Sequence, residues 1–142
     1  ITVVTAFHLR KPGETLEDLQ QIVGPLVSSE CNIFALSVQD PFQLPGDIRD
    51  DLMAFKNAYR TPHAPIETRH LELYTDYCAA FKPEHAPLVT EKMIKETTLT
   101  GTPEELQKRV RKMQELGVSQ ISIAGREAEM SDFATHVMRE LN

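Results

Sequence analysis

The chain has 142 residues, of which 41% are hydrophobic, and its 15 basic against 21 acidic side chains give a formal net charge of −6. No apolar run approaches the roughly 20 residues of a membrane-spanning helix, and the apolar content is too high for a disordered chain. The acidic balance argues against nucleic-acid and anionic-membrane partners, which require clustered Lys and Arg.

The two cysteines and the first residues of the chain bear on its cellular location. Cys31 and Cys78 form neither a disulfide framework nor a CxxC pair. The opening residues ITVVTAFHL lack the basic region of a signal peptide, so we expect a cytoplasmic protein. Because the chain does not begin with methionine, we expect either processing or a start within a longer polypeptide.

The first elements are a strand and a helix. Residues 1–9 are rich in β-branched and apolar side chains, which predicts a strand buried on both faces, as in a parallel sheet. From Thr15, a plausible N-cap, apolar residues recur at helical spacing, and Gly24-Pro25 is expected to kink or end that helix. The apolar positions are Leu16, Leu19, Ile22, Val23 and Leu26.

The middle of the chain, residues 40–90, is predicted to be an irregular helical excursion. Six of the nine prolines lie between Pro41 and Pro87, which favours a functional insertion over scaffold. Within it, Asp47 is expected to cap a helix that carries Ile48, Leu52 and Phe55.

The last third shows the clearest signals. Thr102, Pro103 and Glu105 predict a capping box at the start of a helix whose apolar stripe is Leu106, Val110, Met113 and Leu116. Gly117 is expected to end this helix in the left-handed conformation. Residues 118–124 then alternate as a strand with Ile121 and Ile123 on its apolar face, and a closing amphipathic helix carries Met130, Phe133, Val137 and Leu141.

Two strands joined by a long helical connection must be parallel, and two strands alone are not stable. The pattern therefore predicts an α/β fold that forms part of a larger parallel sheet, with two parallel strands and a long helical insertion between them. The alternative is a small α-rich domain with a minor two-stranded sheet.

Several blocks, in order, resemble the luciferase-like oxidoreductases, which depend on flavin or deazaflavin. The segment Thr97–Ala124 with Gly101-Thr102-Pro103-Glu104-Glu105 is similar to the helix and final strand of their (β/α)8 TIM-type barrel. The residues Pro87–Glu91 resemble the segment that precedes that helix in the family. The residues His70-Leu71-Glu72-Leu73 resemble a histidine-containing helix of the members related to methylenetetrahydromethanopterin reductase. Residues 1–9 and 133–141 are similar to the seventh strand and the closing helix.

The resemblance implies that residues 1–142 are a single segment, the last two βα units of such a barrel. It implies redox chemistry through FMN or a reduced 5-deazaflavin coenzyme, either hydride transfer or monooxygenation of a small organic substrate. The expected partners are that substrate and either further copies of the chain or the remainder of the barrel, without which the chain should not be catalytic.

Five residues are candidates for the site. His8 ends the first strand, where barrels place their active sites, so it is the catalytic candidate, the alternative being a structural histidine at a strand end. His70 and Tyr74 share a helical face and are candidates for coenzyme binding, the alternative being an ordinary surface helix. Gly101 and Thr102 precede a helix N-terminus that could receive an anion, although Thr102 and Glu105 can satisfy those amides themselves.

No metal site is predicted, because His63, His85 and His136 lack ligand spacing with one another and with the cysteines. A second function from another class stays open. The chain could be a non-catalytic, self-associating binding or assembly module whose sheet edges are covered by other copies.

Overall fold

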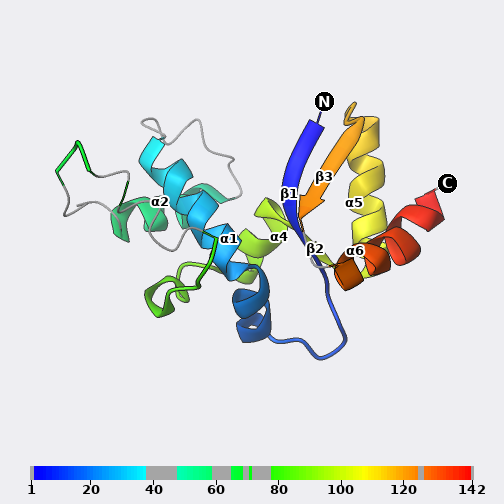
Figure 1. Ribbon diagram of the computed structural model, residues 1–142, viewed down its shortest axis with the longest axis horizontal. Coiled ribbons are helices and arrows are strands. Elements are labelled where there is room, and N and C mark those ends of the chain that lie inside the picture. The colour runs from blue at the N-terminus through cyan, green and yellow to red at the C-terminus, as the bar shows by residue number, and fades with distance from the viewer. Residues whose placement is uncertain are drawn as a thin grey trace. The chain divides into compact units, whose positions relative to one another are not determined.

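The computed structural model describes residues 2–37, 48–58, 65–68, 71, 78–124 and 127–141. The described residues fall into two compact units, residues 1–15 with 95–142 (the sheet unit) and residues 16–94 (the helical unit). Each unit is described by itself. The elements drawn in Figure 1 are β1 (Thr2–Leu9), α1 (Leu16–Ser37), α2 (Arg49–Ala58), η3 (Pro83–His85), α4 (Glu91–Thr97), β2 (Leu99–Gly101), α5 (Pro103–Glu115), β3 (Gln120–Ala124), α6 (Glu127–Phe133), η4 (Ala134–Met138) and η5 (Arg139–Leu141).

The sheet unit contains three parallel strands in the order β2-β1-β3. β1 and β3 pair from Thr2 opposite Gln120 to Ala6 opposite Ala124, which confirms the predicted parallel pairing of the first and last strands. β2 lies on the other edge of β1 and pairs only with Phe7–Leu9. The prediction of two strands was therefore incomplete, because a strand of three residues carries too little pattern to be recognised without its partner.

The two faces of this sheet differ in chemistry. Alternate residues of a strand point to opposite faces, and paired residues of neighbouring strands share a face. One face carries Phe7 and Leu99, which belong to a buried apolar cluster with side chains of α5 and of the carboxyl-terminal helical segment, namely Leu106, Val110, Phe133 and Val137. The other face carries Ala6, His8 and Thr100, all of which are buried.

Helices α5 and α6 pack on the apolar face, as Figure 1 shows. The rings of Phe7 and Phe133 meet edge to face with centroids 4.7 Å apart, which joins β1 to α6. Ile121 and Ile123 lie against the same cluster, so the predicted apolar face of the last strand is confirmed. Two predicted positions of the apolar stripes are wrong, since Leu116 is 66% exposed and Met130 is 45% exposed.

The predicted burial of the first strand on both faces holds only for its carboxyl-terminal half. Ala6, Phe7 and His8 are consecutive buried residues, whereas Thr2 is exposed and Val3 is half-buried. β3 pairs with Thr2–Ala6 and β2 pairs with Phe7–Leu9, so the buried residues lie where the pairing of β1 passes from one neighbour to the other. Burial therefore increases toward the carboxyl end of β1, where His8 pairs with Thr100 of β2.

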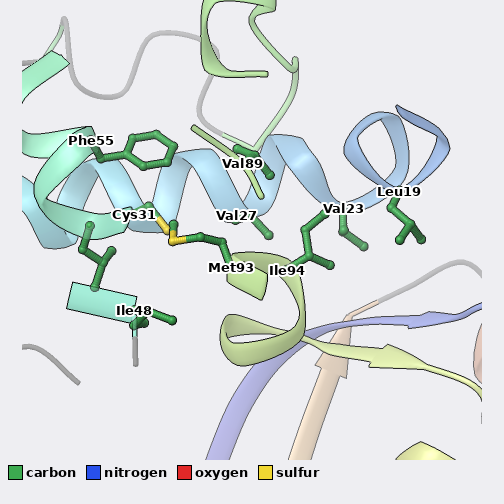
Figure 2. Close-up of a cluster of buried hydrophobic side chains, with 10 residues drawn as sticks. Leu19, Val23, Val27, Cys31, Ile48, Phe55, Val89, Met93 and Ile94 are labelled. Atoms are coloured by element: carbon green, nitrogen blue, oxygen red, sulfur yellow. The ribbon is translucent and has the colours of Figure 1, made fainter. Parts of the chain in front are cut away.

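The helical unit is built on α1, which continues through Pro25 to Ser37, so the expectation that Gly24-Pro25 could end the helix is wrong. The carbonyl of Pro25 accepts hydrogen bonds from the hydroxyls of Ser29 at 2.7 Å and Ser28 at 3.3 Å. Its buried stripe runs at four-residue intervals, as Figure 2 shows, through Leu19, Val23, Val27 and Cys31. The predicted members Leu16 and Ile22 are exposed.

The rest of the helical unit covers that stripe. Ile48, Leu52 and Phe55 are buried as predicted, with Leu52 and Phe55 on α2, whereas their predicted cap Asp47 lies outside the described residues. Gln20 donates its side-chain amide to the carbonyls of Ala86 and Val89 at 2.9 and 2.8 Å, which ties α1 to the segment before α4. Only parts of the predicted excursion at 40–90 are described, and its assignment as one irregular insertion stays a prediction.

Candidate functional site

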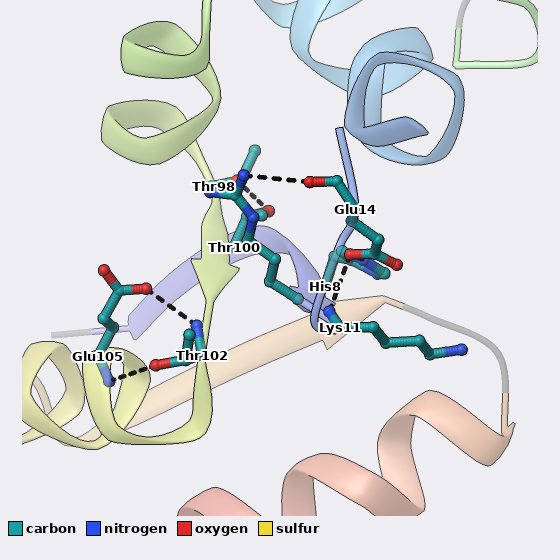
Figure 3. Close-up of polar contacts among 8 residues, drawn as sticks. His8, Lys11, Glu14, Thr98, Thr100, Thr102 and Glu105 are labelled. Atoms are coloured by element: carbon teal, nitrogen blue, oxygen red, sulfur yellow. Dashed lines mark hydrogen bonds and ion pairs between the residues drawn. The ribbon is translucent and has the colours of Figure 1, made fainter. Parts of the chain in front are cut away.

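Polar side chains gather at the carboxyl ends of β1 and β2. His8 on β1 lies directly opposite Thr100 on β2, and the two side chains share the face of the sheet that α5 and α6 do not cover. Thr98, which directly precedes β2, and Glu14, in the turn after β1, complete the group, which we call the carboxyl-edge cluster (His8, Glu14, Thr98 and Thr100) (Figure 3). This edge is where parallel α/β folds place their ligands.

His8 is the most constrained member of the cluster. Its side chain is 4% exposed, and its Nε2 atom lies 2.9 Å from Oε2 of Glu14, whose side chain is 14% exposed. The other ring nitrogen, Nδ1, is buried and has no hydrogen-bond partner among the described residues. A buried polar atom without a partner is uncommon in folded proteins, so Nδ1 marks a position where a partner is expected.

A tight turn after β1 brings Glu14 back to His8. The backbone N–H of Glu14 donates to the carbonyl of Lys11 at 3.2 Å, and Gly13 adopts φ +86°, which favours glycine. Oε2 of Glu14 also accepts the backbone N–H of Lys11 at 2.9 Å (Figure 3). Arg10 anchors the start of the turn to β2, because its N–H donates to the carbonyl of Gly101 at 2.9 Å.

These contacts keep the Glu14 side chain ionised. Burial is the largest influence and raises the pKa of Glu14, but the hydrogen bonds and charges of His8 and Lys11 outweigh it. The pKa of Glu14 therefore lies below its ordinary value. A carboxylate only accepts hydrogen bonds, so Glu14 fixes which nitrogen of His8 carries the proton.

The two threonines add hydroxyl groups beside His8. Thr98 and Thr100 are 1% and 6% exposed, and the Thr98 hydroxyl donates to the Thr100 hydroxyl at 2.7 Å. In that bond Thr100 acts as the acceptor, so its own hydroxyl proton is available for a second bond. The cluster thus offers both a donor and an acceptor at one edge of the sheet.

The other predicted residues of this region, Gly101 and Thr102, belong to the start of α5. The Thr102 hydroxyl accepts the N–H of Glu105 at 3.3 Å, and the Glu105 carboxylate accepts the N–H of Thr102 at 3.0 Å, which confirms the predicted capping box. This bond to Thr102 is the main reason why the pKa of Glu105 is lowered. A Cβ atom on Gly101 would lie 3.0 Å from Oε2 of Glu105, so the glycine leaves room for that carboxylate.

Other predicted features lie apart from the cluster or outside the described residues. His70 and Tyr74 are outside the described residues. His85 belongs to the helical unit, where its ring contacts Phe55 with centroids 5.9 Å apart and burial lowers its pKa. In the described ranges, no group of three His, Cys, Asp or Glu side chains is placed to hold a metal, and no helix is long and apolar enough to cross a membrane.

Sequence reasoning identified His8 but missed Glu14 and Thr98. Glu14 lies six residues after His8, beyond a Pro-Gly turn, and an acidic residue directly after such a turn is a signal that could have found it. Thr98 gives no local signal, because it joins the cluster only through the pairing of β2 with β1.

Comparison of the chain with protein-family models, with curated proteins and with solved structures finds no match. The resemblance to luciferase-like enzymes therefore stays a proposal.

Proposed function

We propose that the chain forms the carboxyl-terminal βα units of a luciferase-like barrel, and that the carboxyl-edge cluster contacts a flavin or 5-deazaflavin coenzyme. The observation that carries the proposal is His8, a buried imidazole at the carboxyl end of the central parallel strand with one nitrogen left without a partner. Ordered sequence blocks, from Pro87 through Gly101-Thr102-Pro103 to the closing helix, agree with the same family.

The layering of the sheet unit supports a barrel. A (β/α)8 barrel packs helices on the outer face of the sheet and turns the other face inward, with its active site at the carboxyl ends of the strands. Phe7 and Leu99 face the helices here, whereas His8 and Thr100 lie on the opposite face at the carboxyl end. In a barrel the carboxyl-edge cluster would therefore lie at the mouth that binds the ligand.

The edges of the sheet leave room for further strands. β1 and β3 would be neighbouring seventh and eighth strands, which matches their parallel register. β2 pairs only with Phe7–Leu9, so on that side Thr2–Ala6 pairs with no strand of the described ranges. A preceding strand of the barrel would pair there.

The candidate site residues differ in how well they suit contact with the coenzyme. His8 fits, because its unpartnered nitrogen can bind a polar group of the coenzyme ring. Gly101 and Thr102 serve the capping box, so we assign them to the positioning of α5. His70 and Tyr74 stay proposed contacts from the excursion.

The bound coenzyme would supply the electrons, by hydride transfer or by oxygen activation for monooxygenation of a small organic substrate. The protein would orient the ring and exclude water from it. His8 would hold the ring at the carboxyl edge, and the Glu14 carboxylate would keep His8 in place.

Coenzyme binding tests the proposal. The full-length polypeptide that carries this chain is titrated with FMN and with a 5-deazaflavin, and binding is followed by flavin absorbance and deazaflavin fluorescence. We expect one of the two to bind saturably, at one equivalent per chain, and His8→Leu to weaken that binding. The exposed Glu17→Gln provides a matched control that should bind as the wild type does.

A well-folded protein that binds neither coenzyme would overturn the proposal. If that protein were also a colourless oligomer, the self-associating assembly module would become the better account. Size-exclusion chromatography with light scattering, run on the same sample, makes this distinction.

A further inference from the structure

The hydrogen bond between His8 and Glu14 determines where the imidazole proton lies. Glu14 is an ionised acceptor, and its Oε2 already receives the N–H of Lys11. The 2.9 Å contact to Nε2 of His8 therefore requires the proton on Nε2. In the neutral ring, Nδ1 then carries a lone pair and is a hydrogen-bond acceptor.

Thr100 places a donor on the same face of the sheet as this acceptor. His8 and Thr100 are register partners on neighbouring strands, which are about 4.8 Å apart, and their side chains share a face. Because the Thr100 hydroxyl accepts from Thr98, its own proton can be donated elsewhere. Nδ1 of His8 and Oγ1 of Thr100 thus provide an acceptor and a donor on register-paired residues of one buried face.

An adjacent acceptor and donor complement a group that carries an N–H next to a C=O. The pyrimidinedione ring that flavins and 5-deazaflavins share has this arrangement at N3–H and its flanking carbonyls. We propose that Nδ1 of His8 and the hydroxyl of Thr100 bind the N–H and C=O edge of this ring, with Glu14 as the residue that positions His8. The inference rests on the proposed function and adds to it the part of the coenzyme that is recognised.

The decisive probe is a coenzyme methylated at N3, which keeps the ring but lacks the N–H. For the full-length wild-type protein, we expect N3-methylation of whichever coenzyme binds to raise its Kd about tenfold or more, the effect of one lost buried hydrogen bond. In His8→Gln, the glutamine amide can still donate to Glu14 but offers no acceptor at the Nδ1 position. We expect this variant to bind the unmethylated coenzyme about tenfold more weakly and to lose most of the discrimination against N3-methyl.

Thr100 and Glu14 have their own variants. Thr100→Val keeps the shape of the side chain and should raise the Kd of the unmethylated coenzyme about fivefold, whereas Thr5→Val, on the opposite face of β1, should leave it unchanged. Nitrogen-15 NMR of the neutral His8 ring should show the proton on Nε2 in the wild type. Glu14→Gln should give a mixture of the two tautomers, because an amide can either donate or accept.

The outcomes separate the inference from the proposed function. If neither coenzyme binds, the proposed function fails and the inference fails with it. If a coenzyme binds but its N3-methyl derivative binds equally well, or if the wild-type ring carries its proton on Nδ1, the inference is overturned while coenzyme binding stands. Discrimination that is present in the wild type and lost in His8→Gln would support it.

Discussion

Replacing Gly101 with alanine should destabilise the protein through the side chain of Glu105. Gly101 is not one of the glycines with positive φ, so its backbone conformation suits alanine. The added Cβ would lie 3.0 Å from Oε2 and 3.3 Å from Cβ of Glu105. The Glu105 carboxylate would have to move away from the N–H of Thr102, which it now accepts at 3.0 Å.

Three contributions set the magnitude. Alanine reduces the entropy of the unfolded chain, which stabilises by about 0.4–1 kcal/mol. Loss of the carboxylate half of the capping box costs about 1 kcal/mol. Small bond-angle adjustments that relieve the 3.3 Å contact with Cβ of Glu105 add about 0.5 kcal/mol. The net effect is a loss of about 0.5–1 kcal/mol in the free energy of unfolding.

A double-mutant cycle isolates the contact between the two residues. Urea unfolding followed by circular dichroism gives the free energy of unfolding for the wild type, Gly101→Ala, Glu105→Ala and the double variant. In Glu105→Ala the cap is already lost, so the alanine at 101 should cost about 1 kcal/mol less than it does in the wild type. A coupling energy below about 0.5 kcal/mol, the scatter for independent sites, would refute the assignment of Gly101 to the capping box.

Three further predictions concern burial and charge. Leu106→Ala should cost about 2–5 kcal/mol because Leu106 is 0% exposed, whereas Leu116→Ala, at a position 66% exposed, should change the free energy of unfolding by less than about 0.5 kcal/mol in the same urea assay. The pKa of Glu14 is lowered in the folded state, so its carboxylate stabilises the protein above pH 4.5, the reference pKa, and this stabilisation is lost as the pH falls through the folded-state pKa. In urea unfolding between pH 6 and pH 3, the free energy of unfolding of the wild type should therefore converge on that of Glu14→Gln. A difference between the two proteins that stays constant with pH would contradict this. Burial lowers the pKa of His85, so the folded state binds fewer protons than the unfolded state, and the free energy of unfolding should fall as the pH drops below 6.5. His85→Phe should reduce the dependence of the free energy of unfolding on pH between pH 7.5 and 5. An unchanged pH dependence would assign it to other groups.

The elements that the sequence predicted correctly are those with strong local signals. The capping box at Thr102 follows from residue types at fixed offsets, and the left-handed Gly117 follows from its place at a helix end. The strand at 118–124 was recognised by alternation, and the structure has it at Gln120–Ala124. In each case the information lies within a few residues.

The features that were missed depend on tertiary contacts. β2 is three residues long and exists through its pairing with Phe7–Leu9. The helix continues through Pro25 because its buried stripe packs α1 from Leu19 to Cys31. Gly24 also packs closely, since a Cβ atom there would come within 2.7 Å of the Phe81 ring. A local propensity penalty at a proline does not outweigh packing of that extent.

The residues of the candidate site also divide into those with a local sequence signal and those that depend on tertiary contacts. His8 was found because a histidine at the end of an apolar strand is conspicuous, whereas its partner Glu14 becomes a neighbour only through the turn at Gly13. The unpartnered Nδ1 is a property of three-dimensional burial and has no counterpart in the sequence.

We propose that the carboxyl ends of β1 and β2 bind a coenzyme ring within a barrel completed by further strands. A crystal structure of the full-length polypeptide grown with its bound flavin or 5-deazaflavin tests it most directly. We predict β1 and β3 as adjacent strands of a closed parallel barrel, with the coenzyme ring in contact with His8 at the carboxyl edge. A self-contained fold in which these strands gain no further neighbours, or a coenzyme bound away from His8, would contradict the account.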